Sequence, residues 1–282
     1  MRQSLTRKIQ TNLANMSSSQ RKIAEYLSHH YEKAVFLTAR ELGNSLGVSE
    51  STVIRFAVLL GYSGYPELQK ALQQMVQNRI TTVERLQRMP IEADGNIINK
   101  VLASDINSIR LTMESANPDF GRAVNAITRA DNIYIVSGRS AAALGYFLFF
   151  YLQMLLKNCR NINGAGTFIE ELRPAGPGDL VIGISYPRYT RQTMEGLKLA
   201  KANGAKVLAI TDSVTSPLVQ YSDYTLIARS VQTSFIDSFV APLSLLNALI
   251  IAVGNKNNTK TAKALGELEA VWQTFHIYHT EN

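Results

Sequence analysis

The sequence predicts an α/β protein in which an all-helical helix-turn-helix domain precedes a domain built on a doubly wound parallel sheet. Three observations predict this order. Residues 1–77 show helical periodicity and two capping boxes, and residues 118–282 alternate short apolar runs with helical segments. The length of 282 residues suits two domains, and residues 78–117 are expected to form a helical linker between them.

Positive charge is concentrated in the first third of the chain. The formal net charge is +7, and residues 1–90 hold 12 Lys and Arg against 6 Asp and Glu, whereas the remainder holds 17 against 16. A basic module on a near-neutral body predicts a polyanionic partner for that module. Charge alone suits a solubilising surface equally well.

The composition narrows the possible classes of protein. Cys159 is the single cysteine, which excludes an internal disulfide and a multi-cysteine metal site. The histidines His29, His30, His276 and His279 form no metal-binding pattern, so we expect neither metal nor cofactor. No run of about 18 apolar residues and no secretory signal is found, so we expect a cytoplasmic protein without a membrane span.

Two helices and a tight turn are predicted in "TARELGNSLGVSESTVIRFAVLLG". Thr38-Ala-Arg-Glu41 is a capping box that starts the first helix, and Gly47 is suited to the left-handed turn that ends it. Ser49 caps a second helix that runs to about Leu60. Gly43 is small where the two helices cross. The residues expected to share the inward face are Leu42, Leu46, Val48, Val53 and Phe56.

This spacing is typical of a helix-turn-helix motif, whose second helix lies in the major groove of DNA. Ser49, Ser51, Thr52 and Arg55 are predicted to contact a double-stranded DNA operator. Hydroxyls bond phosphates or base edges, and Arg55 can reach a guanine edge or a phosphate. An ordinary helical hairpin is the alternative, but the caps, the glycines and the basic charge together favour DNA binding. Two-fold operators imply a homodimer or homotetramer.

Further helices flank this pair. Ser17-Ser-Ser-Gln20 is a second capping box, and it starts a helix with an apolar face; Pro66 lies in the first turn of the helix that follows the pair. Breaks are expected at Pro90 and at residues 94–95. A helix then packs on the second domain, and its apolar positions are Ile97, Val101, Ile106, Ile109 and Met113.

The second domain reads as alternating strands and helices. Continuous apolar strands separated by helices predict a parallel sheet covered on both faces. The expected strands are residues 132–137, 179–185, 205–211 and 223–228, with 159–163 as a weaker candidate. The clearest expected helices are a long apolar one after the first strand and three others, near residues 190–203, 235–253 and 259–275.

Hydroxyl-bearing residues and arginine gather where these strands end. Ligands of such sheets bind outside the carboxyl ends of the strands, and hydroxyls, helix-start amides and arginines together make an anion site. Any one serine or threonine is an ordinary helix cap, but the convergence of several loops favours an anion pocket. The predicted effector contacts are Ser137, Ser140, Ser185, Arg188 and Thr190.

At these motifs the chain resembles the RpiR family of bacterial transcriptional regulators. Members of that family pair an N-terminal helix-turn-helix domain with a C-terminal SIS (sugar isomerase) domain that senses a phosphosugar. "VSESTVIRFAVLLGYSGYPELQ" is similar to the family's DNA-binding signature, "SGRSAAALG" to the first phosphate loop, and "ITDSVTSPL" to a third conserved stretch. The resemblance covers nearly the whole chain. It implies an anionic effector, a phosphosugar or sugar acid, that controls genes of carbohydrate metabolism.

The middle loop departs from the SIS pattern Ser-x-Ser-Gly-x-Thr. This sequence has Ser185-Tyr-Pro-Arg-Tyr-Thr190, so Pro187 and Arg188 replace the inner Ser-Gly pair. Proline removes a backbone donor and arginine adds a cation. Either Arg188 holds the anion itself, or it pairs with an internal acid such as Asp212 or Glu170 and fills the site.

A phosphosugar isomerase with an appended DNA-binding module is the alternative function. Isomerisation needs a general base beside the substrate, and no histidine lies on a predicted sheet loop. Glu170 and Glu171 are near enough in sequence to approach the pocket, but they suit a helix start. We therefore expect a regulator and not an enzyme. Residues 147–156 are more apolar than one helix face needs, which predicts either oligomerisation by the sheet domain or core burial.

Overall fold

The computed structural model describes residues 5–79, 81–88, 96–162, 167–232 and 234–279, and the chain divides into two compact units, 1–81 and 82–282. The helices of the expected linker, α6 (Thr82–Arg88) and α7 (Ile97–Glu114), both belong to the second unit. The expected breaks at Pro90 and residues 94–95 lie outside the described residues.

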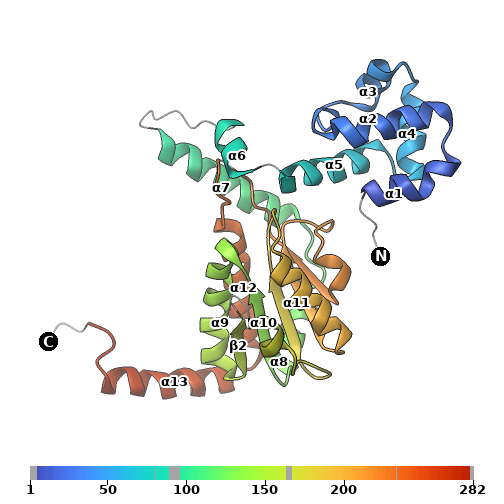
Figure 1. Cartoon of the computed structure of the whole chain (residues 1–282). Coiled ribbons are helices and arrows are strands. Elements are labelled where there is room, and N and C mark those ends of the chain that lie inside the picture. The colour runs from blue at the N-terminus through green and yellow to red at the C-terminus, as the bar shows by residue number, and fades with distance from the viewer. Residues whose placement is uncertain (1–4, 80, 89–95, 163–166, 233, 280–282) are drawn as a thin grey trace. The chain divides into compact units, whose positions relative to one another are not determined.

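The first unit is all-helical, and both predicted capping boxes are formed. Thr38 N donates to Glu41 Oε2 at 2.7 Å, and Ser17 N donates to Gln20 Oε1 at 3.0 Å. These bonds satisfy amide groups that would otherwise have no partner at the helix start. Its helices are α1 (Leu5–Asn12), α2 (Ser18–Ala34), α3 (Ala39–Leu46), α4 (Glu50–Leu59) and α5 (Tyr65–Arg79), with a 3-10 turn at Leu13–Asn15 (Figure 1).

The crossing of α3 and α4 depends on glycine, as predicted. A Cβ atom on Gly43 would lie 2.8 Å from the Val48 carbonyl oxygen, so a larger residue would push the two helices apart. Gly47 ends α3 at a φ of 64°, in the left-handed region that glycine adopts without strain. Leu42, Val53 and Phe56 are fully buried between these helices and α2.

The second unit contains a five-stranded parallel sheet with the order β2-β1-β3-β4-β5. The connections reverse direction between β1 and β3, which is the switch point at which ligands bind in doubly wound folds. The sheet confirms the predicted fold class, including the weaker strand candidate. Its strands are β1 (Ile133–Ser137), β2 (Cys159–Ile162), β3 (Leu180–Ile184), β4 (Lys206–Thr211) and β5 (Tyr224–Ile227).

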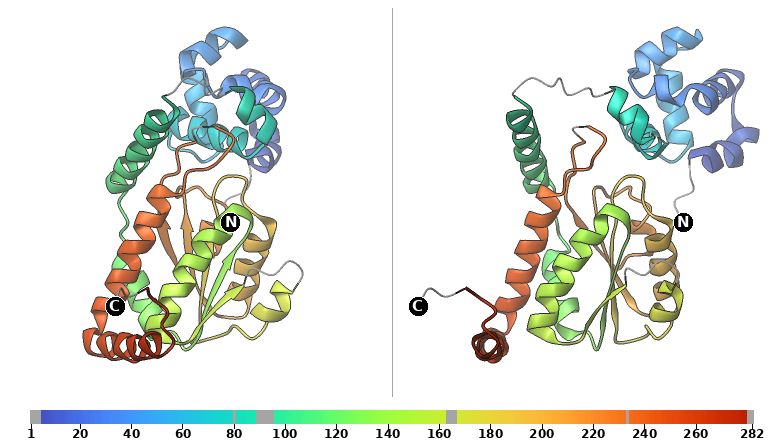
Figure 2. Two further views of the ribbon diagram at one scale, coloured as in Figure 1. Left: turned by 90° about the vertical axis from the view of Figure 1, so that its left-hand side faces the viewer. Right: turned by 60° about the vertical axis from the view of Figure 1, so that its left-hand side comes forward.

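Helices cover both faces of this sheet (Figures 1 and 2). The first face packs on α8 (Phe120–Arg129), α9 (Ala142–Leu156) and α12 (Val240–Lys256), and the other on α10 (Phe168–Leu172) and α11 (Arg191–Ala202). Side chains of a strand alternate between faces, so Ile133 and Ile135 join the first core while Tyr134 and Val136 join the second.

Helix α7 packs on α12 of the second domain, as expected, but only part of the expected apolar face is turned inward. Its buried residues are Asp105 and Ser108, whereas Ile106 is 67% exposed and Met113 is 81% exposed. Ser238 donates to Asp105, and Val231 N donates to Ser108 Oγ. Hydrogen bonds to the segment before α12 therefore hold the inward face of α7, with Val101 and Ile109 half-buried beside it, and Ile97, Ile106 and Met113 remain at the surface.

The segment before α12 corrects one predicted boundary. A helix was expected from about Phe235, but α12 begins at Val240. Gln232 instead pairs with Asp237 in an isolated antiparallel bridge, and Ser230 Oγ donates to the Ser238 carbonyl oxygen. These bonds hold a loop that runs beside the carboxyl ends of the strands.

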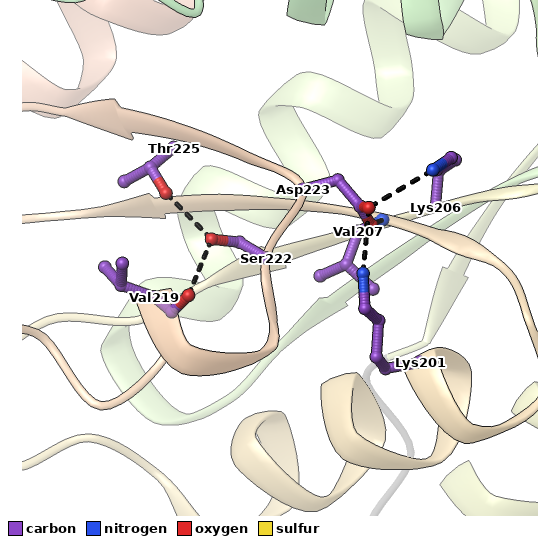
Figure 3. A network of polar contacts seen from close by, with 7 residues as sticks. All are labelled: Lys201, Lys206, Val207, Val219, Ser222, Asp223 and Thr225. Atoms are coloured by element: carbon purple, nitrogen blue, oxygen red, sulfur yellow. Dashed lines mark hydrogen bonds and ion pairs between the residues drawn. The ribbon is translucent and has the colours of Figure 1, made fainter. Parts of the chain in front are cut away.

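Asp223 fastens the start of β5 to its neighbours (Figure 3). Its Oδ1 lies 2.8 Å from Lys201 Nζ and 3.3 Å from Lys206 Nζ, and its Oδ2 accepts from Val207 N at 3.0 Å. Burial opposes ionisation of this carboxyl group, but the bonds from Lys201, Val207 and Lys206 outweigh it and lower the pKa. The carboxylate thus ties β5 to β4 and to the end of α11.

The last helix, α13 (Asn258–Thr274), extends away from the sheet (Figure 1). Ala264 is its buried residue, and its first half packs on α9 and α12. By length and composition alone, residues 139–156 could cross a membrane. In the fold they include α9, whose Leu144, Leu148 and Leu152 are buried against the sheet. Helix α9 therefore packs on the sheet as a core helix, and its apolar composition also reflects exposed residues on its outer side, such as Tyr146 and Phe150.

Candidate DNA-binding and effector sites

The four predicted DNA contacts lie together at the start of α4. Ser49 Oγ accepts from Thr52 N at 3.3 Å and lies 2.9 Å from Ser51 Oγ and 2.8 Å from Thr52 Oγ1. Ser49, Ser51 and Arg55 are exposed, and Thr52 is half-buried. The serine that caps the helix thus also gathers three hydroxyls at its exposed end.

The same exposed face carries two apolar residues that the sequence analysis did not select. Ile54 is 41% exposed and Val58 is 54% exposed, one and two turns beyond Ser51. Apolar side chains on a recognition helix contact the thymine methyl group in the major groove. The sequence could have indicated these two residues, because helical spacing places them on the outward side of a helix whose inward face is formed by Val53 and Phe56.

A cavity of about 460 Å³ lies at the carboxyl ends of β1 and β3, the switch point of the sheet. Three stretches of chain line it together with α6. The lining residues are Gly138, Arg139, Ser140 and Ala141 after β1; Ser185, Tyr186, Pro187, Arg188, Thr190 and Arg191 after β3; Phe235, Ile236, Asp237 and Phe239 before α12; and Thr82 and Arg85 of α6.

Four of the five predicted effector contacts therefore line one cavity, and Ser137 is not among its described lining residues. The Ser137 side chain is fully buried and points at Gly145 of α9, where an added Cβ would overlap its Oγ. Strand alternation explains this direction, because Ser137 follows Ile133 and Ile135 on the α9 side of β1.

The loop after β3 is held by bonds that do not involve Arg188. Thr190 N donates to Ser185 Oγ at 3.2 Å, and Thr211 Oγ1 donates to the Ser185 carbonyl oxygen at 2.9 Å. The Tyr189 hydroxyl donates to Asp212 Oδ1 at 2.7 Å. Burial raises the pKa of Asp212, although the Tyr189 bond opposes the rise, and burial beside Asp212 also raises the pKa of Tyr189.

Arg188 has an unusual backbone conformation for a residue with a side chain. Its φ is 67°, in the left-handed region, at the position where the SIS pattern has glycine. The loop thus keeps the backbone form that glycine favours while presenting a guanidinium group. Arg188 Nη1 donates to Thr82 Oγ1 at 2.6 Å. Of the two acids considered as its partners, Asp212 accepts from Tyr189, and Glu170 is exposed on α10.

The cavity lining is strongly cationic. It includes Arg85, Arg139, Arg188 and Arg191 but one described carboxylate, Asp237. Arg85 is 3% exposed, and its Nη1 lies 3.0 Å from Asp237 Oδ1, so one arginine is neutralised by the carboxylate. Three further guanidinium groups and the N-terminus of α11 favour an anion in the cavity.

Neither a metal centre nor a histidine site is found near the cavity within the described ranges. No group of three or more His, Cys, Asp or Glu side chains in the described part of the chain is placed to hold a metal ion. Among the described lining residues there is no histidine and no glutamate, and Glu171 accepts from Thr167 at the start of α10.

Both parts of the chain match known families. Residues 3–79 match the helix-turn-helix domain of the rpiR family, and residues 126–252 match the SIS domain. An uncharacterised HTH-type transcriptional regulator of Clostridium perfringens is 24% identical over 244 residues, which cover 84% of this chain and 87% of the relative.

Solved structures show the same fold. The sugar isomerase domain of an RpiR transcription factor from Sphaerobacter thermophilus is 28% identical, with a TM-score of 0.60. The alignment covers 62% of this chain and 99% of the chain of that structure. The NanR protein of Vibrio vulnificus, solved in complex with ManNAc-6P, is 20% identical with a TM-score of 0.59. That alignment covers 96% of this chain and 98% of NanR, so both units have a counterpart in one protein.

Proposed function

Because this chain belongs to the RpiR family of helix-turn-helix transcriptional regulators, we propose that it binds an operator through α4 and senses a small anionic metabolite at the strand ends. The observation that carries the effector half is the cationic cavity at the switch point of the sheet. A phosphosugar or a sugar acid has the charge and the hydroxyl groups that this lining complements. The expected targets are genes of carbohydrate metabolism.

We assign the operator contacts to Ser49, Ser51, Thr52 and Arg55, with Ile54 and Val58 added from the geometry of α4. The three hydroxyls at the helix start suit phosphate contacts, which set the register of the helix on DNA. The longer Arg55 side chain and the apolar pair suit contacts with base edges, which determine sequence preference.

We assign effector contacts to Ser140, Ser185, Arg188 and Thr190. Ser185 Oγ accepts from Thr190 N, which leaves its hydroxyl hydrogen available to a ligand oxygen. Thr190 Oγ1 accepts from Thr193 N of α11 and shares a second bond with the Thr193 hydroxyl, so a ligand oxygen would compete with Thr193 for it. Arg188 supplies the charge and a planar fork suited to phosphate or carboxylate. NanR, which has the same fold, was solved with a phosphorylated sugar, and this supports the choice of ligand class.

We expect no isomerase activity. A general base must lie beside the substrate carbon, and the described carboxylate of the lining, Asp237, is paired with the buried Arg85. Incubation with a panel of phosphosugars tests this point directly, and any product would restore the isomerase as the better function.

We expect a homodimer or homotetramer that acts in the cytoplasm, where its operator lies. Exposed apolar residues lie on α7, on α9 and near the end of α13, and a second copy is the partner that a two-fold operator requires. The residues of these surfaces include Ile98, Leu102, Ile106 and Met113 on α7, Tyr146 and Phe150 on α9, and Val271 on α13.

The proposed function is tested in two steps. Fluorescence anisotropy with genomic fragments measures whether the intact protein prefers any fragment over random DNA, and the absence of preference would refute the operator half. A thermal-shift screen of phosphorylated and non-phosphorylated sugars and acids then measures ligand binding, because a ligand of the native state raises its apparent stability. A rise only with uncharged sugars would refute the anion site.

A further inference from the structure

The short helix α6 contributes two residues to the wall of the effector cavity. Thr82 and Arg85 both line it. Arg85 Nη1 bonds Asp237 Oδ1 at 3.0 Å, and Thr82 Oγ1 accepts from Arg188 Nη1 at 2.6 Å. Both partners, Asp237 and Arg188, line the same cavity. Two of the contacts that hold α6 are therefore made to residues of the effector site.

Helix α6 depends on such contacts for its position. It has seven residues, and Val83 is 63% exposed and Leu86 is 50% exposed. Of its described side chains Arg85 is the buried one. An isolated helix of this length is not stable in water, so its packing against the cavity must supply the stability.

The place of α6 in the chain makes its position relevant to DNA binding. The helix-turn-helix unit ends at residue 81, and α6 begins at Thr82. Only residues 80 and 81 separate α6 from α5, the last helix of that unit. A displacement of the first turn of α6 is therefore passed along the chain to the unit that carries α4.

We propose that the effector anion and Thr82 compete for Arg188, so that filling the cavity releases the first turn of α6 and changes the restraint on the DNA-binding unit. This inference rests on the proposed function. An anion brings a full negative charge to the guanidinium group, and the guanidinium fork can take two oxygens of one ligand, whereas the Thr82 hydroxyl offers one neutral acceptor. Arg188 is exposed, so its side chain can turn from Thr82 into the cavity.

The second contact of α6 is expected to stay. Breaking the Arg85–Asp237 pair would leave a buried charge without compensation, which is far costlier than moving an exposed arginine. Residues of α7 hold the segment that carries Asp237, through Asp105 and Ser108. The helix would therefore turn about Arg85 while its first residue moves.

Coupling of this kind is reciprocal, which makes Thr82 testable through effector affinity. If the anion must take Arg188 from Thr82, a variant without the hydroxyl binds the anion more tightly. Because the Arg188–Thr82 bond is exposed to water, its net value is that of an ordinary hydrogen bond and corresponds to a change of roughly three- to tenfold in the dissociation constant. A residue that contacted the ligand would show the opposite sign.

Isothermal titration calorimetry on the full-length protein, with ManNAc-6P and inorganic phosphate as probes, measures this sign. Thr82→Val should bind the probe roughly three- to tenfold more tightly than the wild type, because the anion no longer has to break the Arg188–Thr82 bond. Thr82→Ser keeps the hydroxyl group and should bind the probe as the wild type does. Thr274→Val is the matched control, because Thr274 is an exposed helical threonine on α13 that bonds the Ala270 carbonyl oxygen. It should leave the affinity unchanged.

Hydrogen exchange of the amides of residues 83–88 gives the second readout. The probe that binds should speed exchange in the wild type, whereas slower or unchanged exchange would overturn the inference. Unchanged or weaker binding by Thr82→Val would overturn it as well, while the anion site of the proposed function would stand. If neither these probes nor any anion of the thermal-shift screen bound the wild type, the proposed function itself would fail, and the inference with it.

Discussion

Two substitutions of Arg188, one to glycine and one to alanine, distinguish a residue that contacts the effector from a residue that stabilises the fold. Both substitutions remove the guanidinium group, but they differ in backbone strain because residue 188 has a φ of 67°. A residue with a Cβ atom pays about 1–2 kcal/mol in this region. Glycine pays about 0.4–1 kcal/mol more than alanine in unfolded-chain entropy. We therefore expect Arg188→Gly to be about 1 kcal/mol more stable than Arg188→Ala.

Both variants should keep the loop after β3 in place. The bonds from Thr190 N to Ser185 Oγ, from Thr211 to the Ser185 carbonyl and from Tyr189 to Asp212 do not use Arg188. The effector should bind both variants more weakly. Loss of a hydrogen bond from a charged group costs about 1.5–3 kcal/mol, which is a loss of roughly 10- to 150-fold in affinity.

Urea unfolding measures the stability difference, and calorimetry with the anion found in the thermal-shift screen measures the affinity. Lys157 is the matched control, because its φ is 64° and it is not among the described lining residues of the cavity. Lys157→Gly should exceed Lys157→Ala in stability by a similar amount, with no change in affinity.

Two results would refute this reasoning. If Arg188→Gly binds the anion as tightly as the wild type, Arg188 is not a ligand contact, and Ser185 and Thr190 are the next residues to substitute. If both variants instead lose several kcal/mol of stability, as expected when a buried charge loses its partner, Arg188 serves the fold. Equal stability of the Gly and Ala variants would show that residue 188 has left the left-handed region.

Four further predictions concern other parts of the chain. Arg55→Ala should weaken operator binding by about 1–3 kcal/mol in fluorescence anisotropy if Arg55 reads a base edge; an equal loss on all sequences would indicate a phosphate contact instead. Gly43→Ala should lower the free energy of unfolding of the first unit by about 1–3 kcal/mol in urea, because the new Cβ meets the Val48 carbonyl oxygen; an unchanged midpoint would contradict this crossing. Asp223→Asn should destabilise the protein at neutral pH, and because the folded pKa lies below the ordinary value of 3.8, the difference from wild type should shrink as pH falls below 3.8. Phe150→Glu should reduce the mass measured by light scattering at micromolar concentration, since its exposed ring belongs to the expected subunit interface; a monomeric wild type would remove that interface.

Local signals in the sequence were sufficient for the first unit and for the sheet. The capping boxes at Thr38 and Ser17 join residues three apart, and the glycine at position 47 sits at a turn of its own chain segment. Strands β1, β3 and β4 were recognisable because each is a nearly continuous apolar run buried on both faces. Strand β2 has Arg160 and Asn161 at its centre, which is why it was the weaker candidate. Such features depend on neighbouring residues, so one sequence is enough to predict them.

The cavity was predictable only in part. Ser140, Ser185, Arg188 and Thr190 were found because each follows a strand, and the strands of a parallel sheet end at one edge. Ser137 was chosen by the same rule, but strand alternation turns it toward α9. The inward face of α7 was predicted only in part: Val101 and Ile109 are half-buried, but the buried positions are Asp105 and Ser108, which hydrogen-bond to the segment before α12.

The sequence by itself determined the family, the two units and the loops that carry the candidate contacts. Only the tertiary structure brought α6 into the effector site, where Thr82 meets Arg188 across 106 positions and Arg85 meets Asp237 across 152. No local sequence pattern in α6 predicts these contacts, because charged and hydroxyl side chains are found on any solvent-exposed helix. Their partners are decided when the loops after β3 and before α12 pack at one end of the sheet, and that packing depends on the whole core beneath them.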